Sequence, residues 1–186
     1  MNQLDVLSVL ERDDICKCLD IMSEIHSYTK TCIILAEELS EEGDTFLQPL
    51  KEHRDAYDHL MRVFALPFKV GHKDADTNFS NYIAENINKA LGHEYRAFFD
   101  AADWLTFICR KKIREQLSLR SIKKRYKEKY SDYSETQKFI NSLPFSIATY
   151  RDDKDVSKGE DILGEVLLYK ETIDKLISIY QKVQTL

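Results

Sequence analysis

The feature that most constrains the fold is an apolar repeat of helical spacing that runs without a proline from residue 78 to residue 117. Its apolar residues recur every three or four positions for roughly ten turns of helix. Between Ala97 and Cys109 they spread to every side, which is typical of a helix buried in the middle of a bundle. The sequence therefore predicts a long central helix (about 78–117) that the other elements surround.

The rest of the chain also favours helices over strands. Only five Gly and three Pro are available for turns, and no useful alternation of apolar and polar residues marks a strand. We expect an all-α antiparallel bundle of five or six helices, formed by residues 1–186 as a single domain. A short helix is predicted over 3–12, and another is expected to end before Pro144. Further helical stripes occupy residues 13–39, 46–66, 122–133 and about 157–183.

Composition excludes several classes of protein. No window approaches 18 uninterrupted apolar residues, so no transmembrane helix is expected. The N-terminus has too short an apolar run and the wrong charges for a signal peptide. The four cysteines lack paired zinc spacing and are typical of buried thiols in a reducing cytosol. We therefore predict a cytoplasmic protein with no membrane partner.

Charge is distributed unevenly along the chain. The segment 110–129 carries ten Lys or Arg against two Glu, a net charge of +8, whereas the whole chain has a net charge of −5. Cations track phosphates and tyrosines stack on unpaired bases, so the segment is a candidate site for single-stranded RNA or another polyanion. Two alternatives stay open, a solvated helix whose tyrosines face the core, and a face that docks an acidic protein. The candidate nucleic-acid-binding residues are Arg110, Arg114, Arg120, Lys123, Lys124, Arg125, Tyr126, Lys127 and Tyr130.

A row of polar side chains lies along the same central stretch. Asp100 and Asp103 need partners if this helix is buried, because an unpaired buried carboxylate is costly. Arginines 54, 62 and 96 are the obvious partners. An ion-pair network that only fixes the register of the helices is the alternative to a functional site. The members of the predicted buried polar network are Arg62, His93, Arg96, Asp100 and Asp103.

The sequence lacks the local signatures of metal and nucleotide sites. No histidine follows a glutamate at the Glu-x-x-His spacing of di-iron bundles, and His93-Glu94 has no second histidine at the spacing of zinc proteases. Neither a glycine-rich phosphate loop nor the Gly-x-Ser-x-Gly pattern is present. No metal and no other cofactor is predicted.

One short motif bears on function. Arg54-Asp55-Ala56-Tyr57-Asp58-His59 resembles the Arg-x(4–6)-His motif of the HEPN superfamily, all-helical bundles of which many are metal-independent ribonucleases. The resemblance implies that Arg54 stabilises charge on the phosphate and that His59 acts as general acid or base at the ribose 2′-OH. It also implies a homodimer, because the motif works across a dimer cleft in that superfamily.

Helix geometry adds two points about this motif. Residues five apart lie about 140° from each other around a regular helix, so Arg54 and His59 reach one site only from a cleft edge or across a dimer. Asp55 lies four residues before His59 and is placed either to orient its ring or to form a surface ion pair. The candidate catalytic residues are therefore Arg54, Asp55 and His59.

Together these patterns favour an RNA-binding helical protein that cuts RNA as a homodimer. The alternative is a non-enzymatic interaction or regulatory module whose basic segment docks an acidic partner.

Overall fold

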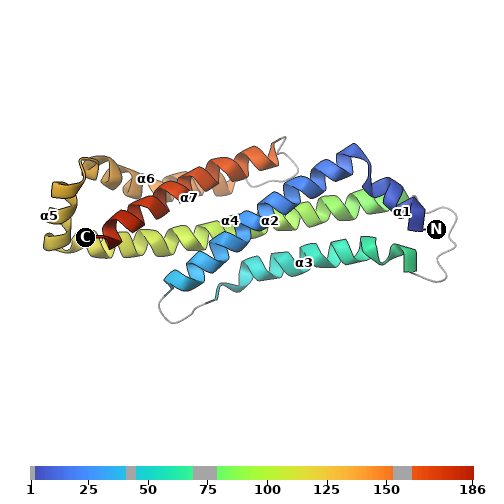
Figure 1. Cartoon of the computed structure of the whole chain (residues 1–186), viewed down its shortest axis with the longest axis horizontal. Coiled ribbons are helices and arrows are strands. Elements are labelled where there is room, and N and C mark those ends of the chain that lie inside the picture. The colour runs from blue at the N-terminus through green and yellow to red at the C-terminus, as the bar shows by residue number, and fades with distance from the viewer. Residues whose placement is uncertain (1–2, 41–44, 69–78, 153–160) are drawn as a thin grey trace.

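The computed structural model describes residues 3–40, 45–68, 79–152 and 161–186, and within these residues it contains helices and no strand (Figure 1). The predicted all-α bundle is confirmed, as is its long central helix. Seven α-helices are present in these ranges, more than the five or six expected, because the chain breaks between residues 10 and 13 and again near Leu119. The helices are α1 (Gln3–Leu10), α2 (Asp13–Leu39), α3 (Leu47–Phe64), α4 (Phe79–Ser118), α5 (Arg120–Lys129), α6 (Tyr133–Asp152) and α7 (Ile162–Gln184), with a 3₁₀ turn at Leu66–Phe68.

Helix α4 extends along the long axis of the molecule and packs against α1, α2, α3, α5 and α7 (Figure 1). Helices α1, α2 and α3 pack on its N-terminal half, and α5, α6 and α7 gather around its C-terminal half. Helices α2 and α7 run in the same direction as α4, whereas α3 and α6 run against it. The molecule is thus two helical groups that share one central helix.

The middle of α4 is buried on all sides, as its composition predicts. Phe98, Phe99 and Leu105 are almost wholly inaccessible, and they belong to one core cluster with residues of α2, α3 and α7. The ring of Tyr169 on α7 stacks on Phe99 at a centroid distance of 5.4 Å and meets Phe98 edge to face. Such aromatic pairs add to the free energy gained from burial and fix α7 against α4.

Helix α6 corrects one expectation, because it continues through Pro144 instead of ending before it. A proline inside a helix removes the N–H that would bond the carbonyl four residues earlier. That carbonyl belongs to Ile140, and it accepts a hydrogen bond from Nη2 of Arg114 on α4 at 3.4 Å. A tertiary contact thus supplies a donor at the position where the proline takes one away.

The start of the last helix is also set by a polar side chain. Asp161 caps α7 by accepting a hydrogen bond from the backbone N–H of Gly164 at 2.9 Å. The expected start of this helix near residue 157 lies outside the described residues. In the described part of the chain, no helix combines the length and the apolar character needed to cross a membrane.

Candidate functional site

Four of the five histidines of the chain meet where α2, α3 and α4 pack together. We call His26, His53, His59 and His93 the histidine cluster. Helix α2 contributes one of them, α3 two and α4 one. Each ring has a polar partner on another helix, so helix packing rather than local sequence assembles the cluster.

His59 is held in a defined tautomer by Asn86. The amide nitrogen of Asn86 donates to the carbonyl of Tyr82 at 2.8 Å, which leaves its Oδ1 as an acceptor facing His59. Nδ1 of His59 lies 2.9 Å from that oxygen and must therefore be the donor. In the neutral ring the lone pair is then on Nε2, where it is available to accept a proton.

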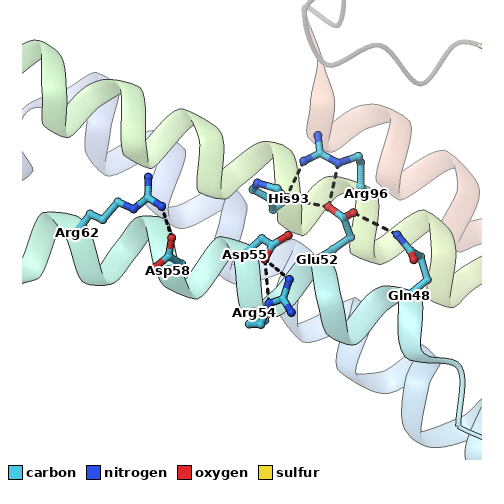
Figure 2. A network of polar contacts seen from close by, with 8 residues as sticks. All are labelled: Gln48, Glu52, Arg54, Asp55, Asp58, Arg62, His93 and Arg96. Carbon is cyan, nitrogen blue, oxygen red and sulfur yellow. Dashed lines mark hydrogen bonds and ion pairs between the residues drawn. The ribbon is translucent and has the colours of Figure 1, made fainter.

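His93 is fixed by a contact with a carboxylate of α3. Its Nδ1 lies 2.8 Å from Oε2 of Glu52 on α3, and Nε of Arg96 donates to the same oxygen at 2.9 Å (Figure 2). A nitrogen of Arg96 also approaches Nδ1 of His93 at 2.7 Å. One ring nitrogen cannot donate and accept at once, and Arg96 already has Glu52 as its acceptor. We therefore assign His93 Nδ1 as a donor to Glu52.

The two fixed rings lie against each other. His59 and His93 stack at a centroid distance of 5.4 Å, both only partly buried, beside the half-exposed guanidinium of Arg96. One imidazole with a free lone pair, a second imidazole and a guanidinium are the groups needed to move protons around a phosphodiester and to balance its charge.

The other two histidines share one carboxylate. Nδ1 of His53 lies 2.9 Å from Oε1 of Glu94, and Nδ1 of His26 lies 3.1 Å from its Oε2. These three ligand groups lie close enough together to hold a metal ion. Glu94 is buried, whereas His26 is half exposed.

The structure separates the candidate residues Arg54 and His59. Arg54 lies on the side of α3 away from α4, with 71% of its side chain exposed, and pairs with the adjacent Asp55 at 2.8 Å (Figure 2). This hydrogen bond lowers the pKa of Asp55. The contact that orients His59, expected from Asp55, comes instead from Asn86.

The predicted polar network is brought together only in part. His93 and Arg96 meet at Glu52, but Arg62 pairs along the surface of α3 with Asp58. Asp103 is buried on the side of α4 that faces α7, where it accepts a hydrogen bond from Tyr169 at 2.5 Å. Asp100 is half-buried.

The basic segment forms the end of α4 and the whole of α5. Tyr126 lies in the core, contrary to the expectation that it stacks on a base, and Lys129 and Lys182 lie over the ring of Tyr130. The stripe of tyrosines thus faces the protein, the alternative that the sequence left open. Most of the cations of the segment are exposed, namely Lys111, Arg114, Arg120, Lys124, Arg125, Lys127 and Lys129.

A groove of about 250 Å³ opens between α4, α5 and α6 within this basic region. Arg114 and Lys123 supply positive charge to its lining, and Ser118, Gln137 and Asn141 supply hydrogen-bonding groups. Charge together with neutral donors suits the binding of a phosphate.

The outer face of α3 carries an exposed apolar row. We call Leu47, Leu50, Tyr57, Met61 and Phe64 the α3 stripe; between 41% and 62% of each residue is accessible. The residues follow one another at helical spacing, and Arg54 lies within the same row. Contiguous apolar surface of this kind is typical of a protein interface.

Comparison of the chain with models of protein families, with curated proteins and with solved structures gave no match. Function is therefore inferred from the geometry of the site.

The sequence patterns assigned no role to five members of the site: His26, Glu52, His53, Asn86 and Glu94. Each of them has a polar partner on a neighbouring helix. Polar residues at core-facing positions are the signal that points to them, since such groups need partners on another helix.

Proposed function

We propose that this protein is an RNA-binding, HEPN-like endoribonuclease that needs no metal for cleavage and acts as a homodimer. The observation that carries the proposal is the fixed tautomer of His59, whose Nδ1 is committed to Asn86 and whose Nε2 is left to take a proton. The neighbouring His93 and Arg96 supply the remaining groups that RNA cleavage requires.

The chemistry follows from these three side chains. Nε2 of His59 removes the proton of a ribose 2′-OH, and the 2′ oxygen attacks the adjacent phosphorus. The bond from phosphorus to the 5′ oxygen breaks, and that oxygen takes a proton from the protonated His93 ring. The guanidinium of Arg96 balances the charge that develops on the phosphate oxygens. The products are a 2′,3′-cyclic phosphate and a 5′-OH.

The basic segment (residues 110–129) is suited to bind the part of the RNA strand that lies away from the cleaved bond. From His93 to Arg114 the distance along α4 is about 32 Å, from the rise of 1.5 Å per residue. A strand held by the groove and the exposed cations of α5 would follow α4 back toward the histidine cluster. Its binding is expected to weaken steeply with salt, because it depends on phosphate contacts.

The α3 stripe supports the dimer. Burying it against a second copy removes exposed apolar surface from water. Arg54 lies within this stripe, so a dimer of this kind would place its guanidinium in the contact between the two copies. Met61→Glu is expected to give a monomer by light scattering and to lower cleavage. A dimer that persists in this variant would contradict the role of α3.

The decisive experiment is cleavage of single-stranded RNA in EDTA. We expect cyclic-phosphate products from the wild-type chain, none from His59→Ala, and none when the nucleotide 5′ to the cleaved bond lacks its 2′-OH. Asn86→Ala should lower the rate by at least tenfold, because His59 loses its orientation. His26→Ala is the matched control and should cleave like wild type.

Circular dichroism verifies that each variant is folded. Cleavage that survives in His59→Ala would come from a contaminant and would refute the proposal. Cleavage that stops when EDTA is added would also refute the proposal, because His59, His93 and Arg96 need no metal.

One observation favours a second candidate, a non-enzymatic module that docks an acidic partner. Tyr126 is buried, and Lys129 and Lys182 lie over the ring of Tyr130, so these two tyrosines offer no open ring for base stacking beside the exposed cations of α5. Neutralising Lys124, Arg125 and Lys127 tests both functions. If the exposed cations hold RNA, binding to single-stranded RNA falls and its dependence on salt becomes shallower. A chain that binds no RNA but retains an acidic protein through these residues would support the module instead.

A further inference from the structure

The contact of α2, α3 and α4 contains a set of metal-ligand groups that the proposed cleavage does not use. Glu94 lies at its centre with 7% of its side chain exposed, and each of its oxygens has a different histidine as neighbour. All three ligand atoms lie within 4.8 Å of one another. Each ligand comes from a separate helix.

We propose that His26, His53 and Glu94 bind one divalent transition-metal ion and that this ion ties α2 to the pair formed by α3 and α4. The inference does not depend on the proposed ribonuclease, because the pair His59 and His93 has its own partners, Asn86 and Glu52.

The distances fit coordination. Metal–ligand bonds of about 2.0–2.2 Å place neighbouring ligand atoms about 2.9–3.5 Å apart, for octahedral or tetrahedral geometry. The separations from histidine nitrogen to carboxylate oxygen are in this range, 2.9 Å from His53 to Oε1 and 3.1 Å from His26 to Oε2. One ligand atom from each residue spans up to 4.8 Å, so the three groups would contract onto a bound ion. The rings of His26 and His53 meet edge to face at 4.8 Å, so both can turn a nitrogen toward one point beside Glu94.

The donor set selects the class of ion. Two imidazoles and one carboxylate suit Zn²⁺ and neighbouring first-row ions, whereas Ca²⁺ and Mg²⁺ prefer oxygen ligands. Three protein ligands leave at least one coordination position for water. Because 54% of the His26 side chain is exposed, an ion has a path to the site from solvent.

The test is titration of tag-free full-length protein, first treated with EDTA, with ZnCl₂ in a calorimeter. We expect one ion per chain and a rise in melting temperature that saturates at that ratio. His26→Ala is the main variant, because its exposed side chain can be removed without disturbing the core. Removing an outer-shell partner costs about 10–100-fold in metal affinity, so removing this ligand should cost at least about 100-fold.

Two further variants make the result decisive. Glu94→Gln should also lose the ion, and His59→Ala should bind it like wild type. Co²⁺ in place of Zn²⁺ should give visible absorption bands that disappear in His26→Ala. Absence of saturable binding, or binding unchanged in His26→Ala and Glu94→Gln, would overturn the proposal. Binding lost equally in His59→Ala would also overturn it. None of these measurements depends on RNA cleavage, so the metal-site proposal can be correct even if the protein does not cleave RNA.

Discussion

Replacing Tyr169 by Phe removes one hydroxyl from the centre of the bundle and leaves the ring in place. That hydroxyl donates to Oδ1 of Asp103 at 2.5 Å, and both residues are buried. The ring keeps its contacts with Phe98 and Phe99, so the substitution creates no large cavity. The variant therefore removes the hydrogen bond between a phenol and a buried carboxyl group.

The expected loss in free energy of unfolding follows from the strength of that hydrogen bond. A hydrogen bond to a charged group contributes about 1.5–3 kcal/mol, and a carboxylate at this depth has little water to replace the lost donor. For a chain of this size each kcal/mol lowers the melting temperature by about 2–4 °C. Tyr169→Phe should therefore melt about 3–12 °C below wild type.

Tyr95→Phe is the matched control. The hydroxyl of Tyr95 donates to Oε2 of Glu165, also at 2.5 Å, but Glu165 is only partly buried. Water can reach this second carboxylate and replace the donor, so the cost should be nearer the ordinary net value of about 0.5–1.5 kcal/mol. The same atom is removed in both variants, and the two carboxylate partners differ in burial.

Urea unfolding followed by circular dichroism measures both costs. The midpoint should fall in each variant while the slope with denaturant stays that of wild type. Equal losses of stability, or a larger loss for Tyr95→Phe, would refute the argument that burial of the acceptor sets the cost.

Two other predictions concern pH and thiol chemistry. The hydrogen bond from Lys182 lowers the pKa of Asp132, so this carboxylate contributes stability above its unfolded pKa that is lost as pH falls through its lower folded value. Asp132→Asn should lower the free energy of unfolding by about 1 kcal/mol or less, because about a third of each side chain of the pair is exposed. Urea unfolding should show this loss shrinking between pH 5 and pH 3. A loss that stays constant over this pH range would contradict the prediction. Burial raises the pKa of Cys32 to about 12 and that of Cys109 to about 11. A thiol reagent at pH 8 should label exposed Cys16 in the native chain but these two only in guanidinium, and rapid native labelling of Cys109 would contradict this.

The fold was more predictable than the site because its main signal is local. The apolar repeat of residues 78–117 predicts α4, since a long helix that is apolar all round has to be the centre of the packing. Pro144 shows where local rules fail. The proline predicts a break, but the carbonyl it leaves without an N–H faces Arg114 of another helix, and sequence position alone does not reveal that contact.

The site was predicted only in fragments for a related reason. Metal and catalytic signatures read from sequence depend on ligands spaced along one element. Here His26, His53 and Glu94 come from three helices, and no local spacing connects them. The Arg54–His59 spacing is local and makes His59 a candidate, but the partner of His59, Asn86, lies on α4 and no short motif includes it.

The contacts between α3 and α4 nevertheless have a single cause, the antiparallel register of these two helices. His59 pairs with Asn86, whereas His53 and Glu52, about two turns earlier on α3, pair with Glu94 and His93, about two turns later on α4. The apolar residues of the same two helices, Val63 and Ile83 among them, pack in one buried cluster and set that register. A slip of one helical turn would separate every polar pair at once. The register that buries the core is therefore also the register that assembles the histidine cluster, and a variant that shifts it should lose stability, RNA cleavage and metal binding together.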